Sequence, residues 1–100
     1  MKHNVWAHIS RALILLKEYP NGLPAREFGK LFWPESPYHR KVYKLGNGVH
    51  RGVGMWLAAG SYLHRLEKKG LVTRNLQFRD QLRWIISEQG RRWIEDEPKD

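Results

Sequence analysis

Side chains able to contact an anionic polymer recur between residues 57 and 68. At about 100° per residue, five of them fall on the side of a helix opposite its apolar positions: Leu57, Ser61, His64, Arg65 and Lys68. A hydroxyl and a guanidinium on such a face can hydrogen-bond base edges in the major groove, while cations contact phosphates. The small run Ala58–Ser61 would let another molecule approach the backbone closely. The alternative is a solvated face whose small residues allow another helix to pack.

A helix over residues 55–69 must present this face. Its predicted buried stripe contains five residues at helical spacing: Met55, Trp56, Ala59, Leu63 and Leu66. Gly70 is suited to the left-handed conformation after the last turn, and Lys68 and Lys69 complement the negative end of the helix dipole. We interpret Glu67, beside these lysines, as part of the same helix-end charge pattern.

Two alternating runs follow this helix with no linker. Residues 72–78 and 82–86 each alternate in side-chain type, with a short polar turn, Arg79–Asp80, between them. Two alternating runs so closely spaced predict a β-hairpin. Ser87 is placed to cap a last short helix over residues 88–95. Residues 95–100 form an acidic tail, which we expect to be disordered.

Two helices are predicted before residue 34. The first covers residues 5–16, with Asn4 as its cap and the turn sequence Tyr-Pro-Asn-Gly at 19–22 after it. The second is a short helix over residues 23–33, with Pro24 near its first position. The predicted fold class is α+β, mainly α, and residues 1–94 form one domain.

A long basic insertion, residues 34–54, separates the second helix from the third. Its prolines and glycines exclude one continuous regular element, so we expect a loop with a short strand or turn at 42–45. The cations proposed to lie on a phosphate backbone are interleaved with Tyr38 and Tyr43: Arg40, Lys41, Lys44 and Arg51.

The charge balance points to a polyanionic partner. Eighteen Lys and Arg residues against ten Asp and Glu give a net charge of +8. Four of the acids lie in the last six residues, so the remainder of the chain is more basic than the total indicates. Such a domain favours nucleic acid first, then an acidic protein surface or anionic lipid. The alternative is that the charge only aids solubility.

The sequence does not predict an enzyme. None of its five histidines forms a pair at i and i+4, and no carboxylate pair lies beside them: His3, His8, His39, His50 and His64. There is no cysteine, which excludes disulfides and thiolate zinc sites. The glycines between residues 46 and 54 lack the Gly-Lys-Ser/Thr of a P-loop. We expect neither cofactor nor metal.

The longest apolar run, residues 12–16, is too short to span a membrane. No signal-peptide pattern precedes it. We therefore expect a cytoplasmic protein with no membrane association.

Two stretches resemble one known family. "YLHRLEKKGLVTR" at residues 62–74 and "WIISEQGRRW" at 84–93 are similar to the winged helix-turn-helix domains of MarR-like regulators. The resemblance implies a three-helix winged helix-turn-helix with a C-terminal β-hairpin wing and a short last helix. It also implies a small transcription regulator, of the phage or mobile-element kind, that binds double-stranded DNA. Regulators of this fold usually bind two half-sites as symmetric dimers, so we expect a homodimer with Val5, Trp6 or Trp93 in the contact. Arg74, Arg79 and Arg83 would place the wing along a neighbouring backbone or minor groove.

The chain departs from the family in two ways. The loop between the second and third helices has about twenty residues instead of three or four, and the long terminal helices used for dimerisation are missing. An alternative function is a protein-interaction module that docks on an acidic partner, such as a transcription factor or polymerase. Trp6, Trp33, Trp56 and Trp93 exceed what a small core needs, so some of them would lie at an interface.

Overall fold

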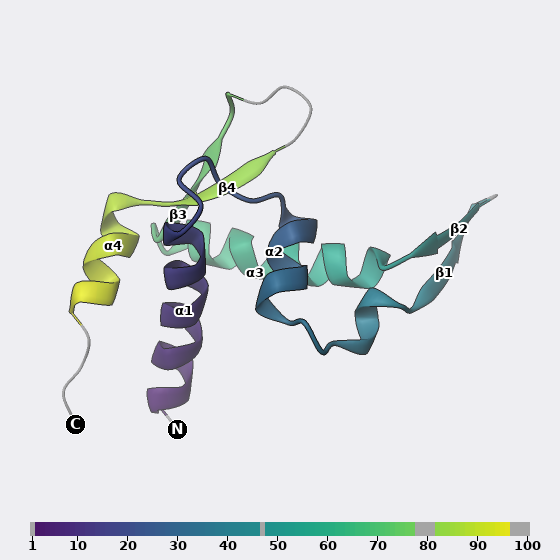
Figure 1. The fold of residues 1–100 in the computed structure, drawn as a ribbon, viewed down its shortest axis with the longest axis horizontal. Coiled ribbons are helices and arrows are strands. Elements are labelled where there is room, and N and C mark those ends of the chain that lie inside the picture. Colours follow the sequence, from purple (N-terminus) through teal and green to yellow (C-terminus); the bar gives the residue numbers. More distant parts are fainter. Residues whose placement is uncertain (1, 47, 78–81, 97–100) are drawn as a thin grey trace.

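The structure, a computed structural model, describes residues 2–46, 48–77 and 82–96. It is α+β and mainly helical, as predicted, with two small antiparallel sheets (Figure 1). The elements in chain order are α1 Lys2–Lys17, α2 Ala25–Phe32, the 3-10 turn η1 Pro37–His39, β1 Val42–Leu45, β2 Gly48–Arg51, α3 Val53–Lys68, β3 Val72–Asn75, β4 Arg83–Ile86 and α4 Glu88–Glu95.

Helix α3 runs along the long direction of a molecule whose extents are 51 × 35 × 21 Å (Figure 1). The β1–β2 hairpin projects beyond the N-terminal end of α3, and the β3–β4 hairpin projects from the opposite half. Helices α1 and α4 pack side by side, with the N-terminal end of α1 and the C-terminal end of α4 on the same side of the molecule. The two hairpins therefore flank α3 from different sides.

The core is built from helical stripes that meet the inner side of the β3–β4 sheet. Helix α2 packs along α3, whereas α1 packs against α4 and β4. Four of the five predicted α3 core residues are buried: Met55, Ala59, Leu63 and Leu66. Ala59, Leu63 and Leu66 join buried residues from the other elements: Ile9, Ala12, Leu13 and Leu16 of α1, Phe28 and Phe32 of α2, and Val72, Trp84 and Ile86 of the sheet.

Trp56 was predicted to be part of this stripe, and that prediction is wrong. Its side chain is 39% exposed. Helix α2 lies over Met55 and Ala59, so close that a Cβ added at Gly29 would come 2.8 Å from the Met55 sulfur. Trp56 lies beside this contact, with the Arg26 guanidinium 5.0 Å above its ring.

The end of α3 is a Schellman motif. Gly70 has the predicted left-handed φ of +78°. Its N–H donates to the Glu67 carbonyl at 2.9 Å, and the Leu71 N–H donates to the Leu66 carbonyl at 3.0 Å. These are the two hydrogen bonds that define the motif. The chain consequently leaves the helix and enters β3 within three residues.

Helix α4 is fixed to this junction by Ser87. As predicted, the Ser87 hydroxyl caps α4 by accepting from the Gly90 N–H at 3.0 Å, and it also donates to the Gly70 carbonyl. On the other side of the sheet, Leu23 and Trp84 exchange backbone hydrogen bonds of 3.0 and 2.8 Å. The connection between α1 and α2 is thereby attached to β4.

Several boundaries differ from the prediction. The strand at 42–45 is confirmed, but the insertion is a hairpin, because Gly46 adopts a φ of +59° and the chain returns as β2. Helix α3 begins at Val53, inside the predicted insertion. Helix α1 begins at Lys2, so Asn4 lies within it and not at its N-cap position. The turn at 79–80 and most of the acidic tail, 97–100, lie outside the described residues, whereas Glu95 ends α4.

Leu66 and Leu57 test the orientation of α3, because they differ in burial on the same helix. Leu66 is 1% exposed and Leu57 is 68% exposed. Leu66→Ala should lower the free energy of unfolding by about 2–5 kcal/mol, since it opens a cavity. Leu57→Ala should change it by about 0.5 kcal/mol or less. Denaturant melts that show equal losses for the two variants would contradict this orientation.

Candidate nucleic-acid interface

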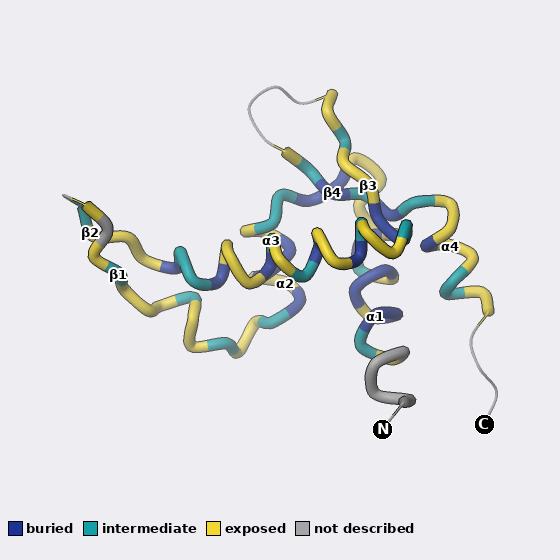
Figure 2. Tube along the Cα trace, turned by 180° about the vertical axis from the view of Figure 1, so that it is seen from behind, coloured by how far each residue is buried: buried dark blue, intermediate teal, exposed yellow. Residues whose placement is uncertain are grey.

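The face of α3 opposite the core is exposed, as predicted. All five predicted contact residues lie on it: Leu57, Ser61, His64, Arg65 and Lys68. Buried and exposed positions alternate along α3 with the helical repeat (Figure 2). The core residues therefore fix the direction in which this face points.

Two cations on this face are available to an outside partner. Within the described residues, neither Arg65 nor Lys68 forms an ion pair. An added Cβ at Gly60 would meet nothing within 4 Å, so the surface beside Ser61 is open. A free guanidinium next to small residues is the arrangement that allows a side chain to reach a base edge.

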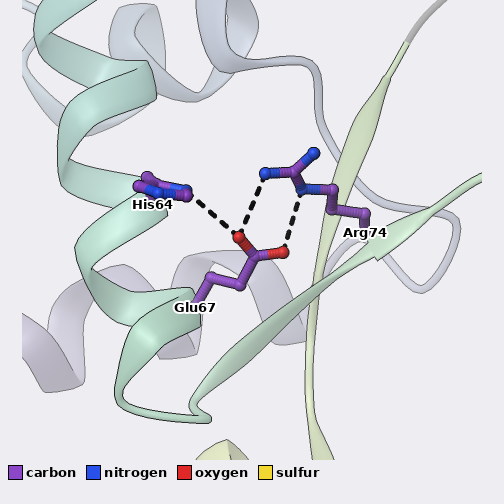
Figure 3. Close-up of polar contacts among 3 residues, drawn as sticks. All are labelled: His64, Glu67 and Arg74. Carbon is purple, nitrogen blue, oxygen red and sulfur yellow. Dashed lines mark hydrogen bonds and ion pairs between the residues drawn. The ribbon is translucent and has the colours of Figure 1, made fainter.

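Glu67 links this helix to the β3–β4 hairpin (Figure 3). The Arg74 guanidinium donates to both Glu67 carboxylate oxygens, at 2.9 Å from Nε and 3.1 Å from Nη2. On the other side, His64 Nδ1 donates to Glu67 Oε1 at 3.1 Å. Glu67 is therefore a tertiary contact between α3 and β3, and its interpretation as part of a helix-end charge pattern is wrong.

The three arginines assigned to the β3–β4 hairpin are not equivalent. Arg74 is held by Glu67 and lies 5.1 Å over the Trp84 ring. Arg83 is partly buried and lies opposite Asn75 in the strand register. Arg79 lies outside the described residues. Arg74 consequently contributes more to joining α3 and the sheet than an unpaired surface arginine would.

The insertion carries its cations on a projecting hairpin. Arg40, Lys41, Lys44 and Arg51 are all exposed. Val42 pairs with Arg51 and Lys44 with Val49, so Lys44 and Arg51 share one face of the β1–β2 hairpin with the two valines, whereas Arg40 and Lys41 directly precede β1. The ammonium of Lys41 lies 5.8 Å and 5.6 Å from the rings of Tyr38 and Tyr43. The hairpin therefore offers a basic ribbon beyond the end of α3.

Tyr43 attaches this hairpin to α3. It occupies the opposite face of the strand from Lys44 and packs on Gly54, where an added Cβ would come 2.6 Å from the Tyr43 hydroxyl. The Gly52 N–H donates to the Lys41 carbonyl at 3.0 Å at the base of the hairpin. The hairpin and the first turn of α3 are in direct contact as a result.

Two of the four tryptophans considered for an interface, Trp33 and Trp93, pack against the core. Trp33 packs with His8, Phe28, Phe32 and Tyr62 where α1, α2 and α3 meet. Burial raises the pKa of Tyr62 to about 12, and burial, followed by the charge of Arg11, lowers the pKa of His8. The side chain of Trp6 lies outside the described residues, and Trp56 is the tryptophan that is exposed among those described.

Within residues 2–46, 48–77 and 82–96, no three of the His, Asp and Glu side chains form a group able to hold an ion. No helix in the described part of the chain is long and apolar enough to cross a membrane.

A double-mutant cycle on Glu67 and Arg74 measures the contact between α3 and the sheet. Both side chains are partly exposed, at 28% and 41%, so we expect a coupling of about 0.5–1 kcal/mol that weakens as salt rises. The variants are Glu67→Gln, Arg74→Ala and the pair, measured by denaturant unfolding. The more exposed pair of Glu88 and Arg92 is the control and should couple by about 0.3 kcal/mol. Additive effects of the Glu67 and Arg74 substitutions would contradict the proposed contact.

Comparisons with known proteins match no family, no curated protein and no solved structure.

Proposed function

We propose that this chain is a double-stranded DNA-binding protein of winged helix-turn-helix, MarR-like type, and a small cytoplasmic transcription regulator. Helix α3 reads the major groove, and the two hairpins contact the backbone on either side. The observation that carries the proposal is the exposed face of α3, where Arg65 and Lys68 have no carboxylate partner among the described residues.

The dimensions of α3 support this role. Sixteen residues make a helix of about 24 Å. With side chains, a helix is about 10–12 Å wide, which matches the major groove. Helix α2 packs along α3, as the first helix of a helix-turn-helix does, and β3 follows α3 immediately.

The β1–β2 hairpin occupies the place of the short turn in that motif. Its exposed cations extend the basic surface past the N-terminal end of α3, in line with the helix (Figure 1). A straight helix and ribbon cannot both follow a curved groove, so the ribbon would leave the groove and cross the phosphates. Lys44 would then hold the duplex without reading its sequence.

Arg65 and Lys44 separate base recognition from backbone binding. Arg65→Ala should weaken binding to a preferred duplex by about 1–3 kcal/mol and relax discrimination at one base pair. Lys44→Ala should weaken binding to all duplexes alike. It should also reduce the slope of log affinity against log salt concentration by about one. Both variants are measured on preferred and scrambled duplexes, the former selected from a random pool. Equal weakening of both duplexes by Arg65→Ala would show that α3 does not read bases.

One observation favours the second function, docking on an acidic protein. Leu57, at the N-terminal end of the α3 face, is 68% exposed, and Leu76 and Leu82 beside the β3–β4 strands are 77% and 41% exposed. Apolar side chains at these positions would suit a protein surface better than a phosphate backbone. In this alternative, Leu57→Ser would abolish partner binding while Arg65→Ala would have a smaller effect.

Binding to two half-sites would require a homodimer. Val5, Trp6 and Trp93 are the residues proposed for the contact, and α1 and α4 place the first and last of these on adjacent helices. Light scattering should give twice the chain mass of 11.9 kDa at high protein concentration. A monomer mass both with and without DNA would rule out the dimer.

A further inference from the structure

A cleft at the root of the β1–β2 hairpin lies outside the α3 face described above. It has a volume of about 410 Å³ and is formed by α2, η1, the end of β2 and the start of α3. Its wall includes Arg26, Lys30, His39, Arg51, Gly52 and Trp56. Arg26 and Lys30, which α2 contributes, were not among the predicted contact residues.

The cleft concentrates positive charge without compensating carboxylates. Three of its side chains are cationic at neutral pH, and no acid is among those that line it. Within the described residues, neither Arg26 nor Arg51 has an ion-pair partner. Lys30 lies 3.9 Å from Glu27, with both side chains half exposed, which is a weak interaction. These three cations repel one another, so an anion bound in the cleft would lower the electrostatic energy of all three side chains.

The N-terminal end of α3 adds to the positive charge of the cleft. Gly52 both lines the cleft and caps α3, with a φ of +77° and no side-chain cap. The backbone N–H groups of the three lining residues at this end are already paired: that of Gly52 with the Lys41 carbonyl, and those of Met55 and Trp56 with the Gly52 carbonyl. Helix α3 therefore contributes the partial positive charge of its dipole rather than free donors.

Two contacts hold the side chains of the cleft in place before any ligand binds. The Arg26 guanidinium stacks 5.0 Å over Trp56, which restrains both groups. His39 Nε2 donates to the Trp33 carbonyl at 2.6 Å, so the imidazole orientation is fixed. A cation that is already ordered loses less entropy when it binds an anion.

We propose that this cleft binds one phosphate group, and that its source is a phosphodiester of the DNA strand adjoining α3. The second part rests on the proposed function. Trp56, which lines the cleft, immediately precedes Leu57, which lies on the proposed base-reading face of α3. The cleft and this face are therefore neighbours on one helix. A phosphate held by Arg26, Lys30 and Arg51 would set the depth and register at which α3 enters the groove.

The phosphate site is tested without DNA by NMR of the tryptophan indole N–H signals. The Trp56→Phe variant assigns the signal of Trp56. Replacing chloride by inorganic phosphate at constant ionic strength should move that signal saturably, and Arg51→Gln should weaken phosphate binding about tenfold or more. Arg91→Gln, an equal loss of charge on exposed α4, is the control and should leave phosphate binding unchanged. A drift without saturation, or equal binding by the Arg51→Gln variant, would overturn the site.

The source of the phosphate is tested by duplex binding at several salt concentrations. Arg51→Gln should reduce the slope of log affinity against log salt by about 0.9, whereas Arg91→Gln should not. Identical slopes for the two variants would overturn the phosphodiester as the source. If the unsubstituted protein binds phosphate but no duplex, the proposed function fails, while the cleft stands as a site for a free phosphate compound.

Discussion

Burial of one stripe of α3 is the constraint on which the rest of the structure depends. Leu63 and Leu66 are almost fully buried, in a core to which α1, α2 and both strands of the β3–β4 sheet contribute. Each of these elements reaches α3 from the inner side, so the outer face receives no cover from the described chain. The same packing that stabilises the domain therefore determines which side chains of α3 a partner can meet.

The junction after α3 transmits this orientation to the β3–β4 hairpin. The Schellman motif at Gly70 sets the direction in which the chain leaves the helix, and Ser87 ties α4 to the same turn. Glu67 adds a side-chain contact to Arg74 across that turn. These contacts hold α3 and the β3–β4 hairpin at a fixed angle. A surface that contacts both a DNA groove and the adjacent backbone would need such a fixed angle.

Features that depend on neighbouring residues could be predicted from the sequence, whereas contacts between separate helices and strands could not. Helical periodicity placed Leu63 and Leu66 in the core, and backbone chemistry identified Gly70 and Ser87, because these signals lie within a few residues of one another. The pairing of Glu67 with Arg74 depends on how sharply the chain turns between them. Trp56 has the periodicity of a core residue, and its exposure follows from where α2 crosses α3. The cleft could not be predicted, because its residues come from four elements that only the tertiary fold brings together.

The central claim is that the exposed face of α3 and its flanking cations bind duplex DNA through electrostatic contacts with the backbone. Equilibrium binding to a duplex, measured from about 50 to about 200 mM salt, tests this claim most directly. Contacts with roughly six phosphates predict an affinity that falls about a thousandfold over that range. Failure to bind duplex DNA at the lowest salt concentration, or an affinity that hardly changes with salt, would contradict the account.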